Sequence, residues 1–534
     1  MKRLDARLAA LAQAGRHRAP AAPGLGELAL RLTAQEPDRV VISYASRRIT
    51  RRALLDMALR LGGGLQGLGL ARGAVIAFQL PNWWEACVIN LAAALFGYRI
   101  VPLMPIYRAA ELGHILPACE VEAIFVPRSY RSTDHAALVA ALPAPPRHVL
   151  TLRDGGGPDT FERLLEAEPG TPAPAEGRDA KLVIFTSGST GKPKGVIHTH
   201  DAMHALIRRT AEFWGTGPDD LLYVPSPIGH VGGALYAFEF PWITGCSVFL
   251  EESWEPELAV RRIDEVGATF MAGATPFLSG LIEAAERAGS PLPSLRRFIC
   301  GGASVPPEMV RRGLAAFPGA VVSRAYGSSE VSLVSPGART RADAEAHADA
   351  DGEVTVELRL LDTAGAVTEG EGEIAVRCPQ MFAGYLDPED DAGAFTPDGF
   401  FRMGDLGRLE DAGFITITGR TKDIIIRKGE NISPLEIENA LARHPSVRAC
   451  AVVGRADPER GELVLAFVVP AAGAGFDLAE MSAHLDRLGL ARQKFPEWLK
   501  IVEALPVNTV GKVQKPLLRE IAAGLTPQEV ERRR

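Results

Sequence analysis

The sequence contains no CxxC pair, although six cysteines are spread along its 534 residues. Each cysteine lies among apolar residues, as Cys300 does in "FIC" and Cys450 does in "VRACAVV". A cysteine zinc site needs closely spaced pairs, and a disulfide framework is typical of short secreted chains. We therefore expect buried thiols in a reducing compartment, and a cytoplasmic protein.

The sequence also lacks an excess of positive charge. Its 58 Lys and Arg face 65 Asp and Glu, which gives a formal net charge of −7, and the two signs are interspersed. Proteins that bind nucleic acids present a basic patch or stripe to the phosphates. Nucleic acid is therefore not expected as the main partner.

No apolar run is long enough to span a membrane. The longest stretch, "ACVINLAAALFGYRIVPLMP" at residues 86–105, is interrupted by Asn90 and Arg99, whereas a spanning helix needs about 20 predominantly apolar residues. The N-terminal "MKRLDARLAALAQAGRHR" has too short an apolar part for a signal peptide. An organelle transit peptide is the alternative there, and Asp5 is atypical of one.

The first part of the sequence alternates short apolar runs with helical patterns. Apolar residues recur at helical spacing in segments such as 50–69 and 256–267. Eight runs between the helices indicate buried strands, at residues 39–45, 74–80, 122–127, 181–185, 220–225, 268–273, 296–302 and 320–326. This alternation predicts an α/β fold in which helices cover mostly parallel sheets.

The pattern changes after residue 350. Short alternating strands at 352–362, 372–378 and 413–419 lie close together, which predicts an antiparallel sheet or a small β-barrel-like subdomain. We expect this subdomain to belong to a large N-terminal domain, residues 1–421.

The remaining residues, 422–534, predict a small α+β domain. One of its helices has a marked start, with Ser433 at the N-cap, Pro434 at the first helical position and Glu436 completing a capping box. The domain is large enough to hold a core of its own.

A polar loop, "TSGSTGKPKGV" at residues 186–196, directly follows one predicted strand. Glycines let backbone N–H groups approach an anion closely, and hydroxyl and lysine side chains add donors. The loop is not a P-loop of the G-x-x-x-x-G-K-[ST] type, because Pro193 follows Gly191-Lys192 and Thr186 stands where the first glycine is needed. On its own the segment indicates either an anion-binding loop or a surface turn.

Three further segments carry polar groups at strand or turn ends. "AYGSSE" presents Tyr326 and Glu330, "GD" and "GR" present Asp405 and Arg420, and "NTVGK" presents Lys512. An aromatic ring can stack on a base, and carboxylates suit ribose hydroxyls or a magnesium ion. Taken singly, Tyr326 is equally explained as a core residue, Asp405 as a turn former and Lys512 as a solvated lysine.

Taken in order, these segments resemble the adenylate-forming superfamily, which comprises acyl-CoA synthetases, nonribosomal adenylation domains and firefly luciferases. The resemblance covers nearly the whole chain, and the segment "QLPNWWEACVINLAAALFGYRIVPLMPIYRAAEL" at 79–112 is similar to short- and medium-chain or cyclohexanecarboxylate-type CoA ligases. "PIGHVGG", "ICGGASVPPEM" and "KDIIIRKGENISPLEIE" match further blocks of the family.

The resemblance implies a two-step reaction. A carboxylate attacks the α-phosphate of ATP with Mg²⁺ to give an acyl-adenylate and pyrophosphate, and the thiol of CoA then displaces AMP. It implies small-molecule partners and allows a homodimer.

The resemblance also assigns roles to individual residues. Lys512 bridges the carboxylate and the α-phosphate from a mobile C-terminal domain, Glu330 places the magnesium, His230 stands between the acyl pocket and the thiol tunnel, and Lys422 is the hinge. Ser329 stands where the family commonly has Thr and keeps the hydroxyl. The nucleotide and CoA residues it implies are Thr186, Ser187, Gly188, Ser189, Thr190, Gly191, Lys194, Gly301, Gly302, Ala303, Tyr326, Gly327, Ser328, Ser329, Asp405, Arg420 and Gly429.

Two features fall outside the family pattern. "HTHDAMH" places His200 and His204 four residues apart, but no third zinc ligand at suitable spacing is near. An acidic segment, "RADAEAHADADGEVT" at 341–355, stands where the family has a connector rich in glycine and proline.

Three functions remain open from the sequence. The first is an acid–CoA ligase, which "RKGENIS" favours; the second is an adenylating enzyme that loads a carrier-protein thiol; the third is an inactive ATP-binding scaffold. The acyl pocket is expected from Phe238, Thr275, Gly301, Ala325 and "GHVGG", with no Lys or Arg to pair with a second carboxylate. An apolar acid with bulk, medium-chain or ring-bearing, is therefore expected.

Overall fold

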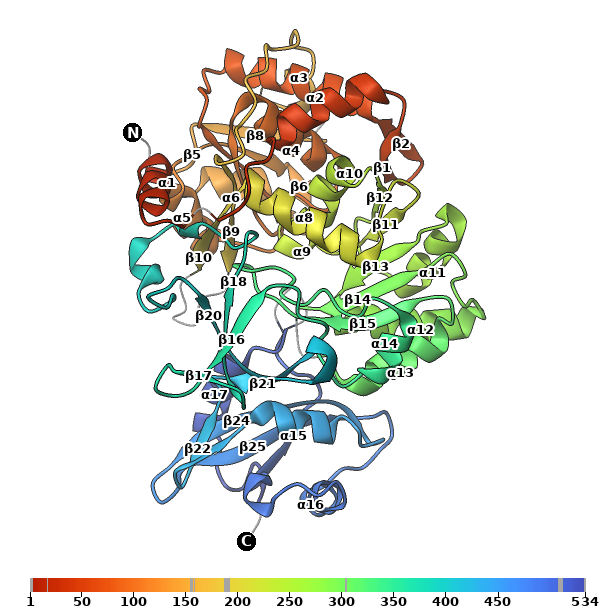
Figure 1. The fold of residues 1–534 in the computed structure, drawn as a ribbon, viewed down its shortest axis with the longest axis vertical. Coiled ribbons are helices and arrows are strands. Elements are labelled where there is room, and N and C mark those ends of the chain that lie inside the picture. The colour runs from red at the N-terminus through yellow and green to blue at the C-terminus, as the bar shows by residue number, and fades with distance from the viewer. Residues whose placement is uncertain are drawn as a thin grey trace.

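The computed structural model describes residues 3–16, 18–153, 157, 159–186, 193–302, 305–507 and 512–532. Two helix-covered sheets form the upper part of the molecule in Figure 1, a third sheet lies below them, and the C-terminal sheet lies at the bottom. This order follows the changes of pattern along the chain.

The first sheet has seven strands in the order β15-β14-β13-β11-β12-β1-β2, and all neighbours except β1 and β2 run parallel. Its strands are β1 (Val40–Tyr44), β2 (Arg47–Thr50), β11 (Leu221–Val224), β12 (Ser247–Leu250), β13 (Phe270–Gly273), β14 (Arg297–Gly301) and β15 (Val321–Ala325). The predicted parallel arrangement is confirmed here.

The second sheet also has seven strands, in the order β19-β10-β9-β4-β3-β5-β8. They are β3 (Val75–Phe78), β4 (Arg99–Pro102), β5 (Val121–Pro127), β8 (His148–Leu152), β9 (Ala180–Thr186), β10 (Lys194–Thr199) and β19 (Gly384–Tyr385). β9 and β10 pair antiparallel, with Thr186 opposite Lys194, so the polar loop joins the ends of two adjacent strands.

Helices cover these two sheets and fill the space between them. They are α1 (Arg3–Gln13), α2 (Leu25–Gln35), α3 (Arg51–Gly67), α4 (Trp84–Phe96), α5 (Ala109–Ala118), α6 (His135–Ala140), α7 (Phe161–Leu164), α8 (His200–Trp214), α9 (Val231–Ala234), α10 (Phe240–Ile243), α11 (Pro256–Val266), α12 (Thr275–Ala288), α13 (Pro307–Ala316) and α14 (Arg341–Ala346). A π-helical turn, Leu235–Glu239, joins α9 to α10, and a small hairpin is formed by β6 (Ser129–Tyr130) and β7 (Thr133–Asp134).

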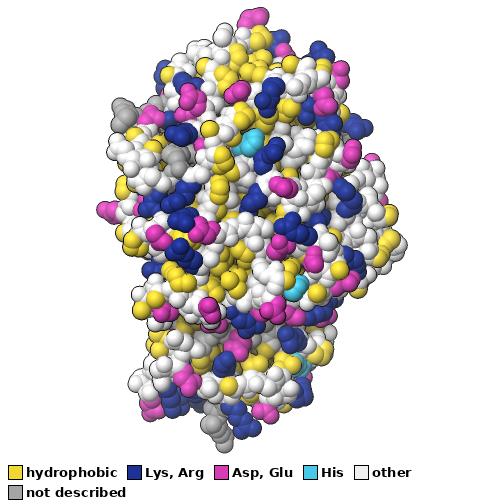
Figure 2. Space-filling model, in the orientation of Figure 1, with side chains coloured by type: hydrophobic (Ala, Val, Ile, Leu, Met, Phe, Trp, Pro, Cys, Tyr) yellow, Lys and Arg dark blue, Asp and Glu magenta, His cyan; other side chains and the backbone are white. Residues whose placement is uncertain are grey.

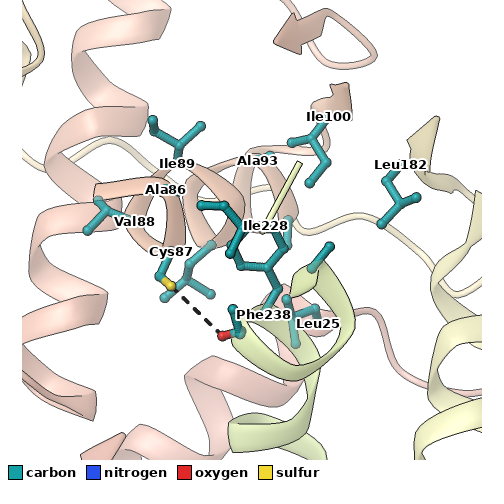
Figure 3. Packing of buried hydrophobic residues seen from close by; sticks show 14 of the residues in the cluster. Leu25, Ala86, Cys87, Val88, Ile89, Ala93, Ile100, Leu182, Ile228 and Phe238 are labelled. Carbon is teal, nitrogen blue, oxygen red and sulfur yellow. Dashed lines mark hydrogen bonds between the residues drawn. The ribbon is translucent and has the colours of Figure 1, made fainter. Parts of the chain in front are cut away.

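The longest apolar stretch of the sequence forms the buried helix α4 and strand β4. All thirteen residues of α4 are buried, as expected for a helix that is apolar on every side. In Figure 3 its side chains pack with Ile228 and Phe238 from the first sheet's connections and with Leu182 from the second sheet. The helix therefore joins the two sheets into one core.

The third sheet is antiparallel, in the order β17-β16-β18-β20-β21. Its strands are β16 (Glu357–Leu361), β17 (Val367–Thr368), β18 (Gly372–Arg377), β20 (Phe401–Leu409) and β21 (Ile415–Arg420). This confirms the predicted antiparallel sheet.

The fourth sheet lies entirely beyond residue 424. It contains β22 (Ile425–Arg427), β23 (Glu430–Ile432), β24 (Val447–Asp457), β25 (Gly461–Pro470), β26 (Trp498–Ile501) and β27 (Glu531–Arg532), with helices α15 (Pro434–Leu441), α16 (Leu478–Arg487) and α17 (Lys515–Gly524). Two apolar clusters in this part contain only its own residues. The predicted small α+β unit is confirmed.

The predicted capping box of α15 is wrong. Ser433 is the N-cap residue and Pro434 opens the helix, but the Ser433 side chain makes no cap hydrogen bond. Its hydroxyl donates to the Thr418 carbonyl, and Glu436 pairs with Lys494 (2.7 Å). Both side chains that a local cap would use are thus bound to tertiary partners instead.

The surface carries a mixture of charges, as the interspersed acidic and basic residues of the sequence predict. Basic and acidic side chains are interspersed on the face shown in Figure 2. Five of the six cysteines are buried, Cys450 is partly buried, and all are free thiols. Within the described residues, no helix has both the length and the apolar character needed to cross a lipid bilayer.

Candidate active site

The centre of the site is a tyrosine–carboxylate–guanidinium network between two sheets. The Tyr326 hydroxyl, just after β15, donates to Asp405 Oδ2 on β20 (2.7 Å). Arg420 Nε lies 2.8 Å from Asp405 Oδ1, and the two residues face each other across β20 and β21. Tyr326 follows β15 and Arg420 ends β21, as the sequence predicts, whereas the prediction of a strand or turn end is wrong for Asp405, which lies in the middle of β20. The structure brings the three side chains together.

Asp405 is a buried carboxylate, only 4% exposed. Burial raises its pKa, while the Arg420 guanidinium, the Tyr326 hydroxyl and the Lys512 ammonium act in the opposite direction. Tyr326 has its pKa raised well above the usual value by burial and by Asp405. The Asp405 carboxylate is thus held as the acceptor of both the Tyr326 hydroxyl and the Arg420 guanidinium.

Lys512 comes to this network from the C-terminal part of the chain. Its pKa is lowered by burial and by Arg420, and the charges of Asp405 and Glu330 act in the opposite direction. Because such effects decay within several ångströms, Lys512 lies within electrostatic range of all three groups. In Figure 1 the C-terminal sheet accordingly lies directly below the third sheet.

His230 also lies within electrostatic range of Lys512. Burial and the Lys512 charge lower the pKa of its imidazole to about 4. Its Nδ1 accepts from the Gly232 N–H (3.3 Å), so His230 caps α9. At neutral pH the ring is therefore uncharged and carries its proton on Nε2.

Glu330 is held by a residue that the sequence did not single out. The Tyr385 hydroxyl donates to Glu330 Oε1 (2.7 Å), and the Phe382 N–H donates to the Glu330 carbonyl (2.8 Å). One residue earlier, His198 Nε2 donates to the Ser329 carbonyl (2.7 Å). Tyr385 and His198 lie in "GYLD" and "HTHD", where nothing local to the sequence indicates these contacts.

The Ser328 hydroxyl shapes the same turn. It accepts from the N–H groups of Glu330 and Val331, each at 3.2 Å. The N–H of Ser328 donates to the Val331 carbonyl, and Gly327 lies so close to Leu333 that a Cβ there would be 2.5 Å from the Leu333 nitrogen. "YGSSE" is thus a tight turn that presents the Glu330 carboxylate.

The polar loop is described only at its two ends. Thr186 ends β9 and Lys194 begins β10, and Lys194 Nζ pairs with Asp390 Oδ1 (2.9 Å), beside the ring of Tyr385. The predicted residues Ser187, Gly188, Ser189, Thr190 and Gly191 lie outside the described residues. The loop ends therefore lie next to the residue that holds Glu330.

The glycines after β14 line the approach to Tyr326. Gly301 lies so close to β15 that a Cβ on it would be 2.7 Å from the Ala325 carbonyl oxygen. Gly302 follows at the strand end, and Ala303 lies outside the described residues. Only glycine at 301 allows the two strands to approach this closely.

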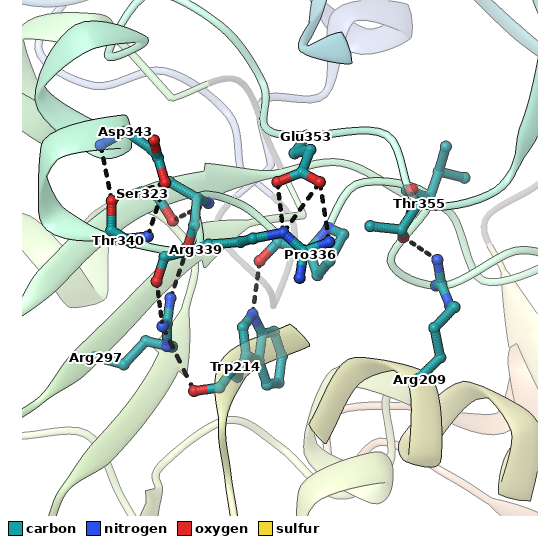
Figure 4. Close-up of polar contacts among 12 residues, drawn as sticks. Arg209, Trp214, Arg297, Ser323, Pro336, Arg339, Thr340, Asp343, Glu353 and Thr355 are labelled. Carbon is teal, nitrogen blue, oxygen red and sulfur yellow. Dashed lines mark hydrogen bonds and ion pairs between the residues drawn. The ribbon is translucent and has the colours of Figure 1, made fainter. Parts of the chain in front are cut away.

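The acidic segment at residues 341–355 binds and stabilises the chain around the "YGSSE" turn. Figure 4 shows Arg339 paired with Glu353 (3.0 Å), Arg209 bound to Thr355, and the Trp214 indole donating to the Pro336 carbonyl (2.8 Å). Asp351 is bound by Arg324 of β15 and by the Ile417 N–H of β21 (2.9 Å). Its acidic residues therefore tie the two strands that carry Tyr326 and Arg420.

The alternative zinc site is not supported. His200 and His204 both lie on α8, but His200 is buried and its Nδ1 accepts from the Leu25 N–H (3.3 Å). In the part of the chain that the structure describes, no group of three or more His, Cys, Asp or Glu side chains could hold a metal ion.

Comparison with known proteins decides the family. Residues 30–386 match the model of the AMP-binding enzyme family, and residues 436–512 match that of the AMP-binding enzyme C-terminal domain. The chain belongs to the AMP-binding enzyme family. Within it, the chain is an enzyme of the AMP-forming acid–CoA ligase family.

Relatives of this family span nearly the whole chain. A medium-chain fatty-acid–CoA ligase of Escherichia coli (strain K12) is 34% identical over 503 residues, covering 91% of this chain and 88% of its own. A salicyl-AMP ligase / salicyl-S-ArCP synthetase of Mycobacterium tuberculosis (strain ATCC 25618 / H37Rv) is 32% identical over 523 residues, covering 93% of this chain and 90% of its own.

A solved family structure bears on the arrangement of the two parts. ATP-bound MatB from Rhodopseudomonas palustris superimposes with a TM-score of 0.82 at 30% identity, covering 93% of this chain and 98% of its own. The apo form of the same protein gives 0.73 with the same coverage. The arrangement here is thus more similar to the ATP-bound form, in agreement with Lys512 lying at the site.

Three further predicted residues are Gly429, Lys422 and Phe238. Gly429 is in the turn between β22 and β23 and has open space around it. Lys422 is exposed, in the turn between β21 and β22. Phe238, expected to line the acyl pocket, is 1% exposed and packs edge-to-face on Phe78, which places it in the core.

Proposed function

We propose that this AMP-forming ligase activates an apolar acid with bulk, medium-chain or ring-bearing, as an acyl-adenylate and transfers the acyl group to CoA. The observation that carries the proposal is the Tyr326–Asp405–Arg420 network, with Lys512 of the C-terminal part within electrostatic range of Asp405, Arg420, Glu330 and His230.

In the first step both reactants, a carboxylate and ATP, are anions. Catalysis must therefore neutralise charge and align the two groups. Lys512 would bridge the carboxylate and the α-phosphate, since a compact ammonium on a flexible stem suits that task. Asp405 and Arg420 would bind the ribose, and the Tyr326 ring would stack on adenine.

The β- and γ-phosphates would lie against the polar loop between Thr186 and Lys194. The donor set beside it fits a magnesium ion, because Glu330 offers carboxylate oxygens and the ion prefers carboxylate and phosphate oxygens. Bound there, the ion would supply charge neutralisation on the leaving pyrophosphate. Tyr385 holds the carboxylate in place through Oε1 (2.7 Å).

The expected acid follows from the residues at the ends of three strands of the first sheet. Gly273, Gly301 and Ala325 end β13, β14 and β15, Thr275 lies two residues after β13, and all four are small and uncharged. Such a lining offers no partner for a second carboxylate and leaves room for an apolar group.

A substrate panel tests the proposal. Pyrophosphate release is measured with acetate, octanoate, cyclohexanecarboxylate, benzoate and malonate, and we expect the highest kcat/KM with one of the three bulky apolar acids. A clear preference for acetate or malonate would contradict the proposed class.

The acceptor is tested with the best acid of that panel. We expect acyl transfer to free CoA rather than to a phosphopantetheinylated carrier protein. The carrier is the second candidate because a relative named for both salicyl-AMP ligation and salicyl-S-ArCP synthesis is 32% identical to this chain. Transfer to the carrier alone would establish that alternative, and no adenylation of any acid would favour an inactive scaffold.

The proposal places the boundary between the two domains at residues 421 and 422. Thr421 is tied to the large domain, because its N–H donates to the Gly404 carbonyl (3.0 Å). Asp423 is tied to the small domain by an ion pair with Arg519 of α17 (2.5 Å). Lys422 is the residue between these two attachments, which supports its role as the hinge.

Replacing Lys422 by proline is expected to damage one half-reaction much more than the other. Proline holds φ near −65° and favours an extended residue before it, so the variant should retain one domain orientation. We expect adenylation to survive, because Lys422 is not among the residues with positive φ in the present arrangement, in which Lys512 lies at the site. Single-turnover pyrophosphate release and thioester formation from purified adenylate are the measurements.

Lys422→Ala is the matched control, because it removes the side chain and leaves the backbone free. Melting temperatures show whether both variants are folded. Equal loss of both half-reactions in a folded Lys422→Pro protein, or no loss, would place the pivot elsewhere.

A further inference from the structure

The segment that carries His230 has no regular secondary structure between β11 and α9, and the Asn82 side chain binds both this segment and the end of β11. The Asn82 amide nitrogen donates to the carbonyls of Val224 (3.2 Å) and Ser226 (2.9 Å). The Ile228 N–H donates to Asn82 Oδ1 (3.0 Å). Asn82, which is 3% exposed, thereby pairs with three backbone groups of one short loop.

The same short motif, "QLPN", binds a second loop. The Gln79 amide nitrogen donates to the carbonyls of Met104 and Tyr107, both at 3.0 Å, and Gln79 Oε1 accepts from His135 Nδ1 (3.0 Å). Two buried amides three residues apart therefore hold the loops that follow β4 and β11.

The two loops lie directly against each other. A Cβ on Gly229 would be 2.7 Å from the Leu103 carbonyl and 2.9 Å from the Met104 nitrogen. Next to this contact Ile228 is fully buried against the α4 core (Figure 3). The backbone just before His230 is thus confined by close packing on one loop and by the three hydrogen bonds of Asn82.

The position of His230 depends on this loop. Its N–H donates to the Pro227 carbonyl (3.0 Å), and Gly233 lies so close that a Cβ on it would be 2.2 Å from the Pro227 oxygen. The turn from Ser226 to Gly233 is therefore a compact unit, and a displacement at Ser226 or Ile228 moves the imidazole.

We propose that Asn82 is a positioning residue for thiol transfer, which acts by holding the loop that carries His230. The inference rests on the proposed function, in which His230 lies between the acyl group and the incoming thiol. A residue at that position must leave a passage of defined width, and a displacement of about 1 Å can cost on the order of 10²-fold in rate. Adenylation depends on Lys512, Asp405 and Glu330, which Asn82 does not contact, so it should be affected less.

The test uses the full-length protein with Asn82→Ala and Asn82→Asp. Alanine removes all three hydrogen bonds, and aspartate keeps the acceptor but turns an oxygen toward two carbonyls. Thioester formation from the purified acyl-adenylate of the best panel acid should fall by on the order of 10- to 100-fold. Pyrophosphate release and the KM for ATP should stay within about threefold of the parent protein.

Backbone hydrogen exchange supplies a readout that needs no substrate. Peptides covering residues 224–230 should exchange on the order of tenfold faster in the Asn82 variants, with the rest of the molecule unchanged. Asn439→Ala, at a partly exposed position on α15, is the matched control and should leave all three measurements unchanged.

The outcomes separate the inference from the function it rests on. If the parent protein forms no thioester, the proposed function fails, whereas faster exchange confined to 224–230 would still show that Asn82 holds the loop. If the parent is active and the Asn82 variants keep a normal thioester rate, the positioning role is wrong. Equal loss of both half-reactions, or unchanged exchange in the loop, would also overturn it.

Discussion

Replacing Lys512 by alanine is expected to reduce pyrophosphate release by on the order of 10²- to 10³-fold, because the variant loses the cation between two reacting anions. Lys512 lies within range of Asp405, Glu330 and Arg420 and is the residue that brings the C-terminal domain's charge to the site. Thioester formation from a supplied acyl-adenylate should continue, since the carboxylate is already activated in that step.

The measurement is a comparison of the two half-reactions on the same preparation. Lys494→Ala is the matched control, because Lys494 is a lysine of the same domain in an exposed pair with Glu436 (2.7 Å), and such pairs contribute little. If Lys512→Ala lowered both half-reactions equally while folded, the assignment of Lys512 to adenylation would be wrong.

Replacing Glu330 by glutamine is expected to raise the activation free energy of adenylation by about 3 kcal/mol, which lowers its rate about 10²-fold. The substitution keeps the size and an oxygen that can accept from Tyr385, so the turn should be preserved. It removes the negative charge that a magnesium ion on the phosphates requires. Initial rates of pyrophosphate release across a magnesium titration measure the effect.

Tyr385→Phe separates the charge of Glu330 from its orientation. It removes the 2.7 Å hydrogen bond and leaves the carboxylate charged, so its effect should be smaller and should shrink at high magnesium. Near-normal rates for Glu330→Gln at saturating magnesium would show that Glu330 is structural.

Much of the fold followed from local pattern. Strand and helix ends were predicted within a few residues because apolar periodicity differs between buried strands and amphipathic helices. α15 shows the limit: Ser433 and Pro434 were correctly placed at its start, but the hydroxyl of Ser433 binds Thr418 instead of the helix end. A local rule fails where a tertiary partner competes for the same side chain.

The candidate site was likewise predicted only in part from the sequence. Tyr326, Asp405, Arg420 and Lys512 could be named from the sequence because the segments that carry them, taken in order, resemble the motifs of the adenylate-forming superfamily. Their mutual contacts could not, since the Tyr326–Asp405 bond joins residues 79 apart. Tyr385 and Asn82 were missed altogether, because a tyrosine and an asparagine in apolar or loop segments carry no local signal of the groups they bind.

The sequence by itself determined the kinds of residue available, their order, and the strands and turns that carry them. Only the tertiary structure decided which of them touch: Tyr385 with Glu330, Lys194 with Asp390, and Asn82 with the loop before His230. The physical reason is that periodicity and turn chemistry act over a few residues. A hydrogen bond such as that from Asn82 to Ser226 spans 144 residues and exists only once the sheets have packed around α4.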